Sequence, residues 1–275
     1  MSAGEWHMVA GSILSTALRR ARMASEIFES THANARPSVT LVPKSSTKAN
    51  RERDEAEISP NVEMYLKTLV RLYDGDTPVP SSAIAKELSV TPPSAYEMLK
   101  RLDNDGFVSH EGRHGVIPTE RGARLGALTL RRQLLAERLL VDQLGLSWEI
   151  AAGEACRLEH AISPVVERGL AEFLRMPTTC PHGHPIPHED GTMWHHERAE
   201  PLSALKMGVE ATVVAVPHDM PEILTFLADI DLRPGAKACV VQRDRLVGLL
   251  TLTVDGGERV VSLQLANSIL MQPAS

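Results

Sequence analysis

The chain has 275 residues, of which 43% are hydrophobic, and a formal net charge of −6. This length is typical of one large or two modest domains with a sizeable apolar core. No run approaches the ~18–20 consecutive apolar residues of a membrane span, and no basic segment leads into an apolar core as in a signal peptide. We therefore expect a soluble, cytoplasmic protein with no membrane partner. Three scattered cysteines are too few for a disulfide framework, so each is expected to be a buried thiol or a metal ligand.

The negative charge is concentrated toward the C-terminal end. Residues 141–275 hold 18 acidic against 10 basic side chains, whereas residues 100–140 hold eight basic against five acidic ones. A local basic patch of this kind is sufficient for contacts with phosphates. The charge distribution is therefore compatible with nucleic-acid binding.

Two segments without regular periodicity divide the chain. Residues 1–30 allow a short helix, and residues 31–57 are polar and aperiodic, so we expect 1–57 to be a disordered N-terminal extension. Residues 177–201 contain five prolines and two glycines, which exclude a long element and predict an inter-domain linker.

Residues 58–123 have the pattern of a winged helix. Helices are predicted from Ser59, Ser81 and Thr91, each at a capping residue, and short strands at 107–109 and 116–118 flank a polar turn. The third helix would enter the DNA major groove, while the hairpin would contact the backbone or the minor groove. The expected DNA-contacting residues are Thr91, Pro93, Ser94, Tyr96, Glu97 and Arg113. Winged helices also serve as dimerisation or docking modules, so the pattern alone leaves that alternative open.

Two further helices are predicted, a long one after Thr119 and another from Trp148, and their apolar excess favours a dimer interface. On a helix over 149–162, an apolar stripe centred on Leu158 includes Ala151, Ala155, Ala161 and Ile162. Cys156, Glu159 and His160 share a face away from that stripe, and their i, i+3, i+4 spacing can converge on one cation. A solvated face with an accidental cysteine explains the same spacing.

Met64 lies opposite the apolar stripe of the first predicted helix. A thioether at that place either packs against a neighbouring helix or is a soft ligand beside Cys156.

The last segment, 202–275, alternates apolar and polar residues in short runs. Strands are predicted near 212–216, 238–241, 246–254 and 259–263, with a helix at 221–228 and a hairpin turn at 255–257. These runs indicate a small β-barrel, which by itself suggests only an interaction module.

Several stretches together resemble the diphtheria toxin repressor family of metal-dependent repressors. They are residues 63–66 (EMYL), 100–106 (KRLDNDG), 135–140 (LAERLL) and above all 154–160 (EACRLEH). The resemblance covers about 60–270 and implies an α+β fold. Its parts are a winged helix-turn-helix DNA-binding domain (58–123), an all-α dimerisation and metal-binding domain (124–176), and a C-terminal SH3-like β-barrel (202–275). It also implies a homodimeric repressor of metal homeostasis genes that binds a palindromic double-stranded DNA operator when a divalent metal is present.

The resemblance carries a primary metal site over to Met64, Cys156, Glu159 and His160. Iron-type members have Met and Cys at two of these places and manganese-type members have carboxylates. Soft sulfur ligands suit Fe²⁺ better than Mn²⁺, so we expect Fe²⁺, with Mn²⁺ as the alternative.

The ancillary site of the family is altered in this sequence. It keeps Glu137, but Gln133 and Ala152 stand where its histidines belong. Asp219 and Glu222 lie near the positions from which the third domain of some members contributes ligands to this site. Without such help, one tight metal ion per protomer is expected.

The remaining motifs are less specific. Cys180 and the five histidines of 177–201 match no closed zinc pattern, and solvated loop histidines are commoner than ligands. No P-loop, HExxH or GxSxG motif is present, so no enzyme is expected. A winged-helix regulator that is not gated by metal stays open as the alternative function.

Overall fold

The computed structural model describes residues 58–112, 114–217 and 220–274, and the elements below lie within these ranges. They form two compact units, one of residues 58–180 with 185–195 and one of residues 181–184 with 196–274. None of the described helices is long and apolar enough to cross a membrane. The expected helix and disordered extension within 1–57 lie outside the described residues.

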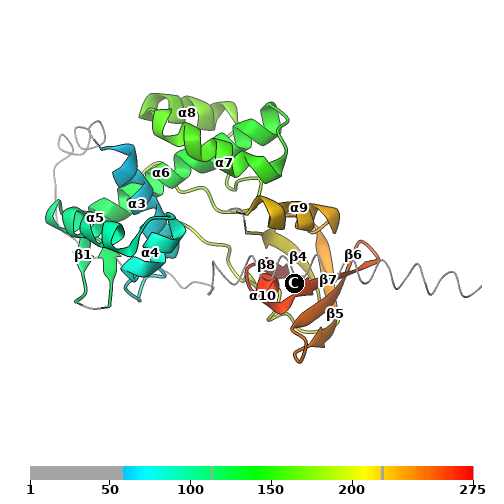
Figure 1. Ribbon diagram of the computed structural model, residues 1–275. Helices are drawn as coiled ribbons and strands as arrows, with labels where there is room; N and C mark the ends of the chain where they lie inside the picture. Colours follow the sequence, from blue (N-terminus) through cyan, green and yellow to red (C-terminus); the bar gives the residue numbers. More distant parts are fainter. Residues whose placement is uncertain (1–57, 113, 218–219, 275) are drawn as a thin grey trace, which may run out of the picture. The chain divides into compact units, whose positions relative to one another are not determined.

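The larger unit begins with the expected helix-turn-helix and hairpin (Figure 1). Its elements are α3 (Pro60–Leu72), α4 (Ser81–Glu87), α5 (Pro92–Asn104), β1 (Val108–His110) and β2 (Val116–Pro118). The two strands pair antiparallel, and an isolated bridge joins Val79 to Val116. The Thr91 hydroxyl accepts the backbone N–H of Ser94 at 3.4 Å and caps α5. The winged-helix prediction is confirmed, with β1 beginning one residue later than expected.

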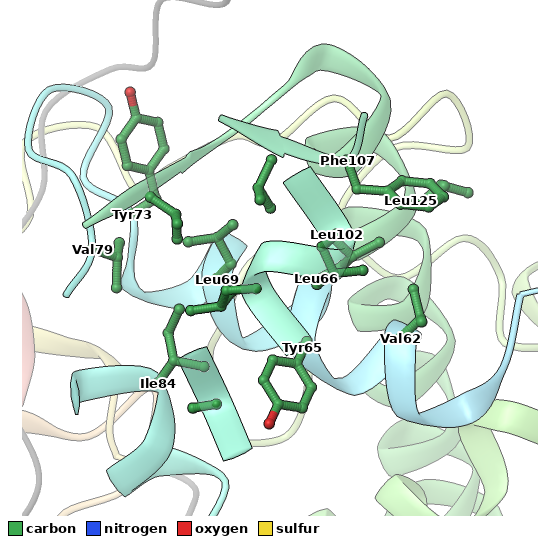
Figure 2. Close-up of a cluster of buried hydrophobic side chains, with 14 of the residues drawn as sticks. Val62, Tyr65, Leu66, Leu69, Tyr73, Val79, Ile84, Leu102, Phe107 and Leu125 are labelled. Carbon is green, nitrogen blue, oxygen red and sulfur yellow. The ribbon is translucent and has the colours of Figure 1, made fainter. Parts of the chain in front are cut away.

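A cluster of buried apolar side chains holds these elements together (Figure 2). Leu66 and Leu69 of α3, Ile84 of α4 and Leu102 of α5 are at most 1% exposed, and Phe107 beside the hairpin is 7% exposed. Burial of a side chain of this size contributes about 1.5–3 kcal/mol. The apolar stripe that the sequence pattern assigns to the first helix supplies the α3 side of this core.

The larger unit continues as a helical layer. Its elements are α6 (Glu120–Arg138), a π-helical turn (Leu139–Gln143), α7 (Trp148–Leu158), a 3₁₀ turn (Glu159–Ala161) and α8 (Pro164–Phe173). The expected long helix after Thr119 is α6, and the expected helix from Trp148 is α7. Because α6 packs on α3, α7 and α8, it joins the winged helix to the helices that follow.

Gly126 of α6 lets α3 and α6 approach closely. A Cβ atom there would lie 2.4 Å from the carbonyl oxygen of Leu66 and 2.8 Å from the side chain of Val70. We expect Gly126→Ala to lower the free energy of unfolding by about 1–3 kcal/mol, because the two helices must move apart. Urea denaturation would measure the loss. Gly153→Ala in α7 is the matched control, since no atom lies within 4 Å of its added Cβ. Equal stability of the two variants would contradict the close approach.

The smaller unit contains a single antiparallel sheet in the order β3-β8-β4-β5-β6-β7. Its strands are β3 (Glu200–Pro201), β4 (Glu210–Ala215), β5 (Lys237–Asp244), β6 (Leu249–Val254), β7 (Gly257–Ser262) and β8 (Leu270–Pro273), with helices α9 (Pro221–Asp229) and α10 (Leu263–Ala266). The turn between β6 and β7 has positive φ at Asp255 and Gly256, as the predicted hairpin requires. The short strands β3 and β8 were not predicted.

Candidate metal centre

A polar cluster lies where α3, α6 and the end of α7 meet. Polar and sulfur-bearing side chains from three separate stretches of the chain converge there. They are Glu63, Met64 and Lys67 of α3, Arg132 and Gln133 of α6, and Cys156, Glu159 and His160 at the end of α7 and in the 3₁₀ turn. Three chain segments are therefore needed to build one site.

The structure brings together the four residues that the sequence analysis assigned to the primary metal site. The Cys156 Sγ lies 4.0 Å from the Met64 Sδ and 3.9 Å from the Glu159 Oε1. The Nε2 of His160 lies 3.3 Å from the same oxygen. A thioether, a thiol, a carboxylate and an imidazole thus face one small volume.

The apolar stripe on α7 was predicted correctly only in part. Leu158, taken as its centre, is 40% exposed and Ala161 is exposed, whereas Glu159 is fully buried. Ala151 and Ala155 are buried as predicted, and Trp148 and Ala152 complete the buried arc of α7. The pattern failed because the hydrophobicity of one leucine outweighed three small alanines, and because α7 ends at Leu158 and tightens into a 3₁₀ turn.

His160 is oriented by an acidic neighbour. Its Nδ1 lies 2.6 Å from the Glu63 Oε2, and the other oxygen of Glu63 accepts from Arg132 Nη2 at 3.0 Å. When Nδ1 donates to this carboxylate, the neutral imidazole keeps its Nε2 lone pair for a ligand on the other side. Metal-binding histidines are typically held in this way. Glu63 was not predicted as part of the site, although it directly precedes Met64.

Lys67 is the second residue of the site that was not predicted from the sequence. Its ammonium lies 2.6 Å from the Glu159 Oε1, 3.0 Å from the Gln133 Oε1 and 3.6 Å from the Cys156 Sγ. The residue is only 2% exposed. The spacing of Glu63 and Lys67, four residues apart and so neighbours on α3, places Lys67 near Glu63 but does not show that it meets Glu159.

The buried ligand atoms fit a divalent cation. Burial raises the pKa of the Cys156 thiol, and it raises the pKa of the Glu159 carboxyl, while the Lys67 charge opposes both changes. Among the described residues, the Glu159 Oε2 has no hydrogen-bond partner although it is buried. An unpartnered carboxylate oxygen beside a thiol, a thioether and an imidazole is a donor set for a soft or borderline metal ion.

A second group of possible ligand atoms lies within the larger unit around Glu137. Glu137 is fully buried, accepts from the Gln133 Nε2 at 3.1 Å, and has a ligand atom within 4.8 Å of the Cys180 Sγ. His182, two residues after Cys180, is also fully buried. The burial of Cys180 agrees with the expectation of a buried thiol or a metal ligand, whereas the expectation of solvated loop histidines is wrong for His182. Of the other expected contributors, Asp219 lies outside the described residues and Glu222 is exposed on α9.

The expected DNA-contacting residues lie on one exposed part of α5. The side chains of Pro93, Ser94, Tyr96 and Glu97 are exposed, whereas Ala95 between them is buried in the core. Exposed Thr91 precedes them as the cap of α5, and its hydroxyl lies 2.9 Å from the Ser94 hydroxyl. Arg113 lies outside the described residues.

Part of the expected basic patch is not available to DNA. Arg131 is 6% exposed, and its Nε donates to the Glu167 Oε1 at 2.8 Å. Arg132 pairs with Glu63, and Arg138 donates to the Thr179 carbonyl at 2.7 Å. Of the eight basic side chains of 100–140, Arg131 is therefore too buried to contact a phosphate, and Arg132 and Arg138 are engaged within the same unit.

Comparisons with known proteins cover nearly all of the described residues. Models described as "Iron dependent repressor, N-terminal DNA binding domain", "Iron dependent repressor, metal binding and dimerisation domain" and "FeoA domain" match residues 57–116, 119–188 and 200–273. The iron-dependent repressor IdeR of Mycobacterium tuberculosis is 34% identical over 220 residues, which are 74% of this chain and 93% of IdeR. The diphtheria toxin repressor of Corynebacterium diphtheriae is 31% identical over 221 residues, 76% of this chain and 96% of that protein. A solved manganese-dependent transcriptional repressor in complex with manganese superposes with a TM-score of 0.72 at 27% identity, covering 78% of this chain and 100% of the other.

Proposed function

Because this chain belongs to the iron-dependent repressor family, we infer that it is a DNA-binding transcriptional repressor whose activity depends on a divalent metal ion. The observation that carries this inference is the convergence of Met64, Cys156, Glu159 and His160 beside a winged helix. We assign these four residues as the metal ligands. A bound divalent ion would supply positive charge to a buried carboxylate and thiol, and so join α3 to the end of α7.

We propose Fe²⁺ as the physiological metal and keep Mn²⁺ as the alternative. Thioether and thiolate donors favour softer ions, and Mn²⁺ is the weakest binder of the first-row series at a given N, O, S site. The relatives IdeR and the diphtheria toxin repressor support iron, while the manganese complex among the solved neighbours supports the alternative.

Glu137 and Cys180 support a second metal position in the larger unit. Carboxylate and thiolate are both strong ligands when deprotonated. The loss of the two family histidines at Gln133 and Ala152 is then offset in part by Cys180.

For DNA recognition we propose that the N-terminal half of α5 reads the major groove and that a homodimer binds a palindromic operator. The domain boundaries proposed for this function are 58–123, 124–176 and 202–275, with 177–201 as a connecting loop. The protein would act in the cytoplasm, where its operator DNA lies.

The test is selection of binding sites from a random double-stranded DNA library, with and without Fe²⁺, under anaerobic conditions. We expect enrichment of a near-palindromic sequence with Fe²⁺ only, and a dimer mass in the complex. Equal enrichment with and without metal would contradict metal gating and support the ungated winged-helix alternative.

Glu97 offers a test of base recognition by α5. A carboxylate can accept from the cytosine amine, and one good contact of this kind discriminates bases by about 1–3 kcal/mol. We expect Glu97→Ala to lose preference at one operator position by roughly 5–150-fold, measured by anisotropy with single-base variants. Glu197→Ala, an exposed glutamate outside the DNA-binding domain, is the control. An equal change of affinity for all operator variants would instead place Glu97 near the DNA backbone.

A further inference from the structure

The Lys67 ammonium lies inside the proposed primary metal site. It contacts the Glu159 carboxylate at 2.6 Å and the Cys156 Sγ at 3.6 Å, so it touches two of the four proposed ligands. We propose that Lys67 is a built-in cation that competes with the metal ion for Glu159, and so raises the metal concentration at which the protein responds. This proposal rests on the proposed function, because it concerns the same site.

Lys67 is held in this place by its surroundings. At 2% exposure its charge is removed from water, so it needs a counter-charge and hydrogen-bond acceptors. Within the described residues its ion pair is with Glu159, which is itself fully buried. Gln133 supplies the other acceptor at 3.0 Å.

Gln133 holds Lys67 in place because its own amide group is held at both ends by hydrogen bonds. Its Oε1 accepts from Lys67 while its Nε2 donates to the Glu137 Oε1 at 3.1 Å, so both ends of the amide are engaged. Gln133, which stands where the family has a histidine, therefore also helps to hold Lys67. An amide oxygen can accept from an ammonium while the amide nitrogen donates to a carboxylate, and this links the two candidate metal positions through Lys67 and Gln133.

Two electrostatic effects follow, and both oppose metal binding. In the metal-free protein, Lys67 already neutralises the Glu159 carboxylate, so a metal ion gains less from binding it. An ammonium that remains near Glu159 and Cys156 would also repel a divalent ion held by those ligands, in surroundings where charge interactions are stronger than in water. A neutral side chain of similar length removes both effects.

The two oxygens of Glu159 differ in their partners, so Lys67 and a metal ion can each bind one of them. Lys67 engages Oε1, and Oε2 has no hydrogen-bond partner among the described residues. The carboxylate can therefore receive a cation at one oxygen before the lysine leaves the other. Lys67 thus weakens metal binding without blocking it.

The experiment compares Co²⁺ binding by anaerobic wild-type protein, Lys67→Met and Lys67→Gln. Titration is followed calorimetrically and by the thiolate-to-cobalt absorption band, so no DNA-binding readout is needed. We expect the two neutral variants to reach half-saturation at a Co²⁺ concentration at least about tenfold lower than that of the wild type. Lys206→Met, which removes an exposed lysine of the other unit, should leave the affinity unchanged.

Stability measurements keep the test decisive if the buried pair is needed for folding. We expect the metal-free neutral variants to unfold at lower temperature than wild type and to gain more from Co²⁺, because the metal takes over as the counter-ion of Glu159. Variants that fold only with Co²⁺ would support the proposal. Variants that bind Co²⁺ no tighter than wild type, or that stay unfolded with Co²⁺, would overturn it. Failure of the wild-type protein to bind Co²⁺ would instead contradict the proposed function.

Discussion

DNA binding by the His160→Ala variant is expected to be insensitive to Fe²⁺ or Co²⁺, whereas metal should strongly stimulate binding by the wild type. Removal of the imidazole takes away one of four proposed ligands. The loss of metal affinity should exceed the roughly 10–100-fold that follows loss of a ligand's hydrogen-bond partner alone. Cys156→Ala is expected to give the same result, because it removes the proposed thiolate ligand.

Both substitutions are suited to the test because neither strands a buried charge. Glu63 loses His160 but keeps its ion pair with Arg132 at 3.0 Å. Glu159→Ala would be a poorer choice, because it would leave the Lys67 ammonium buried without its counter-charge. Metal binding would be followed by calorimetry and DNA binding by anisotropy.

The matched controls remove the same residue types elsewhere. His188→Ala replaces an exposed histidine, and Cys239→Ala replaces a half-buried cysteine of the other unit. Both should retain the metal response of the wild type. A normal metal response in His160→Ala or Cys156→Ala would show that the ligands are misassigned.

The winged helix was predictable because its signals are local. A proline or hydroxyl cap opens each helix, and the apolar stripe of α3 recurs with helical spacing. The hairpin is marked by a polar turn between two short apolar runs. Local capping and periodicity act over a few residues, so they can be read from sequence before any tertiary contact is known.

The metal site was predictable only in part, because its second half depends on helix packing. Cys156, Glu159 and His160 share one short stretch, and their spacing alone suggests a cation site. The roles of Lys67 and Gln133 appear only when α3 and α6 are side by side, since 66 residues separate them in the chain. Helical spacing cannot show which charged residue of one helix will meet a carboxylate from another.

The basic patch was overestimated for the same reason. A count of charges along residues 100–140 does not show that Arg131 faces Glu167, 36 residues away, in the interior. Buried polar groups are paired inside the protein, and such pairs are invisible to composition.

The Glu137 position changes the expected metal stoichiometry. From sequence alone, one tight ion per protomer is expected, because Gln133 and Ala152 replace two ligands. The structure places the Cys180 thiol near the Glu137 carboxylate in a buried setting, so a second strong ligand is present. We therefore expect two Co²⁺ ions per wild-type protomer in anaerobic calorimetric titration.

Cys180→Ala should remove one of these two ions and leave the other. Each proposed position holds one cysteine, so the thiolate-to-cobalt band should fall by about half in Cys180→Ala and by about half in Cys156→Ala. Because Cys180 is small and buried, its replacement by alanine opens only a small cavity and should preserve the fold. Cys239→Ala should keep both ions and the full band. A single ion in the wild type, or two ions in Cys180→Ala, would show that Glu137 and Cys180 do not bind metal, and that the buried thiol only packs against α6.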